Sequence, residues 1–133
     1  LKRCSHGARP ETAWAAGVGS RMAGWYTRLC RLLDEDPLID EYALVPQANA
    51  SLFGGEVGGR EDEGCVASDH KLAISLEAAL VIYRHAHRVM REAGSSACPP
   101  SRTEVAAASR AVLLCNADCA GAWACREELL RDR

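Results

Sequence analysis

The cysteines and histidines are the residues of this sequence with the clearest potential for metal or nucleophilic chemistry. Seven cysteines are present, and three of them, Cys115, Cys119 and Cys125, lie close together. A zinc site usually combines two closely spaced ligand pairs, and here no second pair supplies the fourth ligand. His85 and His87 are two positions apart, so a helix would point them to different sides. We therefore favour reduced, hydrophobic cysteines of a cytosolic chain over a zinc-binding or redox protein.

Carboxylates and glycines could support acid–base chemistry or phosphate binding, but their contexts favour neither. The acidic runs at 34–36, 40–41 and 61–63 have the pattern of solvated faces. The glycine pairs at 54–55 and 58–59 lack the following helix that a phosphate-binding loop requires. We therefore expect no catalytic residue, no cofactor-binding residue and no metal ligand in this chain.

Charge and hydropathy exclude further classes of partner. The chain has 16 Lys and Arg against 18 Asp and Glu, a net charge of −2, which excludes a strongly basic nucleic-acid-binding protein. No run approaches the roughly 18 apolar residues of a transmembrane helix, and residues 1–21 lack the apolar run of a signal peptide. We expect a cytoplasmic protein that neither binds nucleic acid nor inserts into a membrane.

The composition favours helices, because alanine is abundant and aromatic residues make up only 5% of the chain. Residues 1–22 are expected to be disordered. Since the first residue is Leu, we expect the true start to be Met22, with residues 1–21 upstream of it. A short helix and an extended segment are predicted over 23–46, and a flexible, glycine-rich and acidic loop over 47–67. Helical hairpins are predicted over 68–133, where the chain ends in helical register, as a truncated chain would.

The helical zone has apolar residues at a period of about 3.6. The first long helix is predicted to begin at Ser68-Asp69 and to end near Gly94. Ser101 and Glu104 have the spacing of a capping box at the start of the next helix. The residues predicted to form the hairpin core are Leu76, Leu80, Tyr83, Val112 and Leu113.

The turn after this second helix carries the most specific pattern of the chain. The segment Leu113-Leu114-Cys115-Asn116-Ala117-Asp118 leads into Trp123, and Arg126 follows about one helical turn later. Asn116 and Asp118 favour a turn rather than a helix interior. We expect Trp123 to be buried between the helices and Arg126 to form a hydrogen bond to a neighbouring helix.

This pattern resembles the repeat of the protein prenyltransferase α-subunit family, a helical hairpin around Leu-Asn-Pro-x-x-(aromatic)-x-x-x-Trp-x-x-Arg. The single copy, over about 101–133, has Ala117 in place of Pro, Cys119 in place of an aromatic residue and Ala124 in place of the Asn that often follows Trp. Three further segments resemble the N-terminal part of a family member in the same order, namely 36–46, 70–74 and 80–84.

The resemblance implies an all-α fold, the N-terminal part of an α-α superhelix of helical hairpin repeats. It implies an α-type, non-catalytic subunit of an enzyme that transfers a farnesyl or geranylgeranyl group to a C-terminal cysteine of a protein substrate. The catalytic zinc would belong to the partner β subunit, here of the Rab geranylgeranyl transferase type, and the substrate would already carry one lipid. The residues that match the family motif, all with structural roles, are Asn116, Asp118, Trp123 and Arg126.

A non-enzymatic helical-repeat scaffold, which binds peptides through tetratricopeptide-like hairpins, is the alternative function. A single hairpin does not define a repeat period, so the sequence leaves both functions open.

Overall fold

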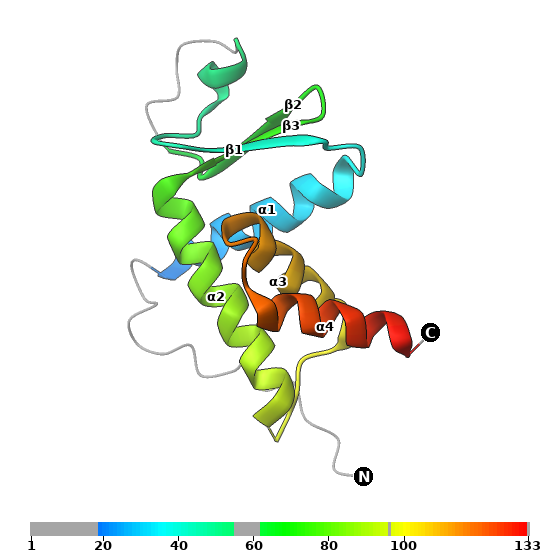
Figure 1. Cartoon of the computed structure of the whole chain (residues 1–133). Coiled ribbons are helices and arrows are strands. Elements are labelled where there is room, and N and C mark those ends of the chain that lie inside the picture. Colours follow the sequence, from blue (N-terminus) through cyan, green and yellow to red (C-terminus); the bar gives the residue numbers. More distant parts are fainter. Residues whose placement is uncertain (1–18, 55–61, 96, 133) are drawn as a thin grey trace.

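The computed structural model describes residues 19–54, 62–95 and 97–132, and Figure 1 shows their arrangement. The helices are α1 (Gly19–Glu35), α2 (Leu76–Ser95), α3 (Arg102–Cys115) and α4 (Ala120–Arg131). Between α1 and α2 lie a 3-10 helix, η2 (Ala50–Phe53), and three strands, β1 (Glu41–Val45), β2 (Cys65–Ser68) and β3 (Lys71–Ser75). The described chain is therefore mostly helical but contains a small sheet, so the expectation of an all-α fold is wrong on this point.

The sheet has β3 in its centre, parallel to β1 and antiparallel to β2. The β2–β3 hairpin turns at Asp69 and His70, whose φ angles of 49° and 64° are both left-handed, as a type I′ turn requires. Both faces of β3 are buried: Leu72 and Ile74 belong to the main core, and Ala73 packs in a second cluster with Val66 and Ala48. The hairpin signal was hidden from sequence analysis because Asp-His is an uncommon pair for this turn.

The start of α2 corrects the predicted helix boundary. Leu72 and Leu76 are four residues apart, a helical spacing, and this led to a predicted start at Ser68-Asp69. In the structure, Leu72 belongs to β3 and α2 begins at Leu76. The Oγ of Ser75 accepts a hydrogen bond from the N–H of Ala78 at 3.0 Å and so caps the helix.

The predicted flexible loop over 47–67 is ordered at both ends. Asn49 caps η2 through its side-chain oxygen. Asp62 Oδ1 accepts hydrogen bonds from the N–H groups of Gly64 at 2.8 Å and Ala48 at 3.4 Å, which joins the two ends of the loop. The last residues of the predicted loop form β2.

Two expectations fall partly outside the described residues. Residues 55–61, in the middle of the predicted loop, are not described, and neither are residues 1–18 of the segment predicted to be disordered. Residues 19–22, which belong to the same predicted segment, are helical and form the start of α1.

The sheet is fixed to α1 by contacts between residues far apart in the sequence. Arg28 donates through Nε to the carbonyl of Cys65 at 2.7 Å and forms an ion pair with Glu63 at 2.8 Å. Gly64 lies directly against the indole of Trp25 with a φ of +79°, and any Cβ at this position would overlap the ring. Glycine is therefore required here both for its backbone conformation and for its lack of a side chain.

The main core lies between α1, the sheet, α2, α3 and α4 (Figure 1). Many of its buried residues are alanines, which let the helices approach closely. Val112, one of the predicted core residues, is completely buried. The fully buried members of the core are Leu29, Cys65, Ile74, Ala78, Ile82, Ala86, Ala108, Ala111, Val112 and Ala122.

Two other predicted core residues, Leu76 and Leu80, lie on the surface and are 55% and 51% exposed. Helix α2 instead buries a neighbouring face that contains Ala78, Ile82 and Ala86, because α1 and α3 pack on that side. Alanines give a weak hydrophobic signal, so the leucine stripe dominated the sequence pattern. Tyr83 and Leu113, also in the predicted core, are partly buried at its edge.

Candidate functional site at the turn between α3 and α4

The candidate site is the turn that joins α3 to α4, and Asn116 organises its backbone. The N–H of Asn116 donates to the carbonyl of Val112 at 2.7 Å and ends α3. Its side-chain oxygen accepts the N–H of Asp118 at 3.2 Å, and its carbonyl accepts the N–H of Cys119 at 3.2 Å. These are the bonds of an Asx turn, so Asn116 sets the turn and Asp118 contributes its backbone N–H.

Trp123 does not occupy the buried position expected from the sequence, since it is 54% exposed. Its indole Nε1 donates to the carbonyl of Ala117 at 2.8 Å, so the ring folds back over the turn. Ala122, the preceding residue, is the one that α4 buries in the core. The expectation was wrong because a motif gives the residue type but not the face that the neighbouring helix covers.

Arg126 connects α4 to α3 through the hydrogen bonds expected of it. Its guanidinium donates to the carbonyl of Ala106 at 3.2 Å and to the Oγ of Ser109 at 3.3 Å. Ser109 is fully buried and donates to the Ala106 carbonyl at 3.1 Å. Arg126 therefore satisfies polar atoms between the two helices and fixes their relative position.

Two cysteines near this turn, Cys115 and Cys125, lie in environments that disfavour the thiolate. Burial raises the pKa of Cys115 to about 11, and burial also raises the pKa of Cys125. Both thiols are thus protonated at neutral pH, which is unfavourable for nucleophilic chemistry. Over the described ranges, no group of three or more His, Cys, Asp and Glu side chains is placed to hold a metal ion.

The two histidines of α2 have different ring partners, as their spacing predicts. His85 lies 4.6 Å from the ring of Tyr26 on α1, measured between centroids. His87 stacks within its own helix on Tyr83 at 5.6 Å. The two imidazoles therefore contribute to different surfaces of the helix.

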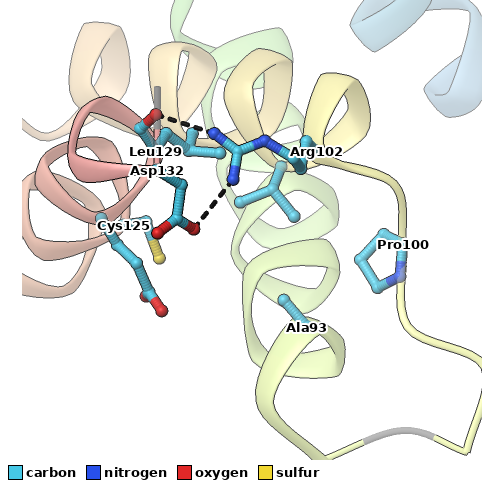
Figure 2. Close-up of a pocket in the computed structure, with 8 residues that line it drawn as sticks. Ala93, Pro100, Arg102, Cys125, Leu129 and Asp132 are labelled. Carbon is cyan, nitrogen blue, oxygen red and sulfur yellow. Dashed lines mark hydrogen bonds and ion pairs between the residues drawn. The ribbon is translucent and has the colours of Figure 1, made fainter.

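A shallow groove of about 190 Å³ lies beside the hairpin, where the end of α2 meets the start of α3 and the end of α4 (Figure 2). Arg102 crosses it, donating to the carboxylate of Asp132 at 2.9 Å and to the carbonyl of Leu129 at 2.8 Å. These bonds satisfy the C-terminal end of α4, so the arginine serves the hairpin itself. The residues that line the groove are Ala93, Pro100, Arg102, Val105, Cys125, Glu128, Leu129 and Asp132.

A polar contact between α1 and α3 was not anticipated from the sequence. Arg110 of α3 forms an ion pair with Asp34 at 3.0 Å, while its buried Nε has no hydrogen-bond partner among the described residues. Tyr26 and Cys30 lie on the same side of α1, and burial raises the pKa of both groups. The four-residue spacing of Tyr26, Cys30 and Asp34 was the available signal, since it places them along one stripe of a helix.

Comparison with known proteins adds no relative: no protein-family model matches the chain, and no curated protein matches it. The helices in the described part of the chain also lack the combination of length and apolar character that crossing a membrane requires.

Proposed function

We propose that this chain is the α-type, non-catalytic subunit of a protein prenyltransferase, and that it pairs with a zinc-bearing β subunit of the Rab geranylgeranyl transferase type. The observation that carries the proposal is the α3–α4 hairpin, in which Asn116 sets the turn and Arg126 bonds back to α3. These are the positions at which the sequence resembles the family repeat.

The outer face of the hairpin supports a place in a helical array. Trp123 and Leu130 of α4 are 54% and 63% exposed, although both are large apolar residues. Each unit of a hairpin array leaves such a face for its neighbour to cover. A superhelix of such units, with this chain as its N-terminal part, is therefore part of the proposal.

The order of the other segments also supports it. The segment 36–46 resembles the segment that precedes the first repeats of the protein prenyltransferase α-subunit repeat-containing protein 1, and in this structure it contains β1. The segments 70–74 and 80–84 resemble the two ends of the first long helix of that protein. In this structure 80–84 lies on α2, as that resemblance implies, whereas 71–74 belongs to β3 and departs from it. A sheet beside the first helices would then be a feature of the subunit's N-terminal end.

The chemistry of prenyl transfer assigns different work to the two subunits. A substrate thiolate attacks the first carbon of the isoprenoid diphosphate, and the diphosphate leaves. The zinc of the β subunit would hold the thiolate. In this proposal, the present chain supplies no reacting group but holds the β subunit and the protein substrate in position.

Co-expression with the Rab geranylgeranyl transferase β subunit tests the proposal. We expect the two chains to co-purify and to transfer an isoprenoid to a protein with a C-terminal cysteine that already carries one lipid. Arg126→Leu should weaken co-purification, because α4 then loses its fixed position on α3. Arg131→Leu, on the exposed side of the same helix, is the matched control and should leave it unchanged.

Failure to pair with any prenyltransferase β subunit, in a preparation whose helical circular dichroism is intact, would contradict the proposal. In that case, the scaffold function would replace it. Pairing without prenyl transfer would contradict the enzymatic part alone.

A further inference from the structure

Strand β1 forms an exposed edge of the sheet. Among the strands of the described ranges its only neighbour is β3, and β2 lies on the far side of β3 (Figure 1). Residues 41–44 are exposed and Val45 is half-buried. An edge strand presents backbone N–H and C=O groups that another extended chain can pair with, and no described strand pairs with the outer side of β1.

Beyond Glu41, its first residue, this edge lacks the side chains by which proteins usually prevent strand pairing. Natural edges carry a lysine, a proline, a bulge or an inward-pointing charge. Residues 42–45 have none of these, and no charged residue occurs between Glu41 and Glu56. Pro46 follows directly and limits the length of the edge without interrupting it.

The side chains on the edge are apolar and lie on one face. Tyr42 and Leu44 are opposite Leu72 and Ile74 of β3, two residues of the buried core. The core face of the sheet therefore continues onto β1, where Tyr42 and Leu44 are still 47% and 41% exposed. A further strand would extend this face and cover both side chains.

We propose that β1 is a dimerisation edge, on which a second copy of the chain adds its own β1 in antiparallel orientation. A two-fold axis at Ala43 would place Tyr42 of each copy opposite Leu44 of the other copy. This makes two pairs of apolar side chains on the same face of the sheet. Glu41 would lie opposite the partner's Val45, which keeps the acidic ends apart. Parallel pairing in register would instead set Glu41 beside the partner's Glu41, and like charges at that position repel.

The contact would join two three-stranded sheets into one of six strands. Two five-residue edges bury less than the roughly 1,200 Å² of a stable interface, so the dimer should exchange with monomer and form with rising concentration. This inference concerns β1 alone and does not depend on the proposed function, which rests on α3 and α4.

Sedimentation velocity of the 133-residue chain over a range of concentrations tests the proposal. We expect a shift toward twice the monomer mass as concentration rises, with hydrogen exchange at residues 42–45 slowing in parallel. The double variant Tyr42→Lys, Leu44→Lys should weaken self-association by about tenfold or more, because it places charges on the pairing edge. Both changed side chains are exposed, and a thermal melt checks that the fold survives.

The matched control is Leu130→Lys on α4, a residue that is 63% exposed but remote in sequence from the sheet. It should leave self-association unchanged. A chain that stays monomeric at every concentration would overturn the proposal, even if β1 then paired with a strand of another protein. Self-association that depends on Leu130 rather than on Tyr42 and Leu44 would overturn it equally.

Discussion

The sheet with α1 depends on long-range contacts, whereas the α3–α4 hairpin combines long-range contacts with local caps. In the sheet region, Arg28 contacts Glu63 across 35 positions and Asp36 contacts His70 across 34. In the hairpin, the cap at Ser101 and Glu104 and the turn at Asn116 and Asp118 are local, spanning three and two positions. The contacts that join its two helices span 17 positions, between Arg126 and Ser109, to 30 positions, between Arg102 and Asp132. Local contacts form between neighbours in the chain, whereas long-range ones need the fold to bring them together. The sheet region should therefore be the more sensitive to single substitutions.

The two tryptophans give the largest expected difference between the regions. Trp25 is 7% exposed beneath the sheet, whereas Trp123 is 54% exposed on α4. Trp25→Ala should lower the free energy of unfolding by about 4 kcal/mol, the loss typical of a buried aromatic residue. Trp123→Ala should lower it by only about 1 kcal/mol, because most of its ring remains in water.

Urea unfolding of both tryptophan variants measures this difference. The sequence alone, which predicted a buried Trp123, implies a loss of about 3–5 kcal/mol at that position. A loss of that size for Trp123→Ala would mean that the hairpin is as dependent on its aromatic residue as the sheet region is.

Two glycines sharpen the same comparison. Gly64→Ala should destabilise the protein by about 3 kcal/mol, because a left-handed φ and a collision with Trp25 combine. Gly121→Ala, on α4, meets open space and should instead stabilise the helix by up to about 1 kcal/mol. Thermal melts of the two variants should therefore shift in opposite directions.

Arg126 tests the strongest link within the hairpin. Arg126→Leu should lower the free energy of unfolding by about 1–2 kcal/mol, because its hydrogen bonds to Ala106 and Ser109 are partly buried. Arg131→Leu removes an exposed ion pair with Glu127 and should cost no more than about 0.5 kcal/mol. Equal losses in chemical denaturation would show that Arg126 does not hold the two helices together.

The smallest expected effect is a pH dependence at the end of α1. The Nδ1 of His70 lies 2.8 Å from Asp36, which raises the pKa of the imidazole above its ordinary 6.5 and lowers the pKa of the carboxyl below 3.8. The stabilisation from protonated His70 is complete below pH 6.5 and is lost as pH rises through the raised pKa. The stabilisation from Asp36 is present above pH 3.8 and is lost as pH falls through the lowered pKa.

An NMR titration of His70 checks this directly. The midpoint in the folded protein should lie above 6.5, and Asp36→Asn should bring it down toward that value. A midpoint that Asp36→Asn leaves unchanged would show that the pair does not form in solution. His70 is exposed and Asp36 is partly exposed, so the change in stability with pH should be small and should shrink further in salt.

Particular residues show which parts of the fold could be predicted from the sequence. The Ser101–Glu104 capping box and the turn at Asn116 were predicted, because each depends on residues within a few positions of one another. The sheet was not predicted, because the helical spacing of Leu72 and Leu76 favoured a helix where the chain forms a hairpin at Asp69-His70. Pairing with β1, thirty residues earlier in the chain, adds to the hairpin in favouring the strand.

The candidate site divides in the same way. The hydrogen bond from Arg126 to a neighbouring helix was predicted from its position one turn after Trp123 on α4. The exposure of Trp123, and of Leu76 and Leu80 on α2, did not follow, because it depends on where the other helices pack.

The sequence by itself determined that α2, α3 and α4 are helical, and it determined the capping box of α3 and the turn between α3 and α4. These features rest on backbone preferences and hydrogen bonds within one or two turns. The tertiary structure alone decided that residues 41–75 contain a sheet, that Gly64 accommodates Trp25, and which face of each helix is buried. These outcomes depend on packing between distant segments, where alanine-lined surfaces fit more closely than the larger leucines would allow.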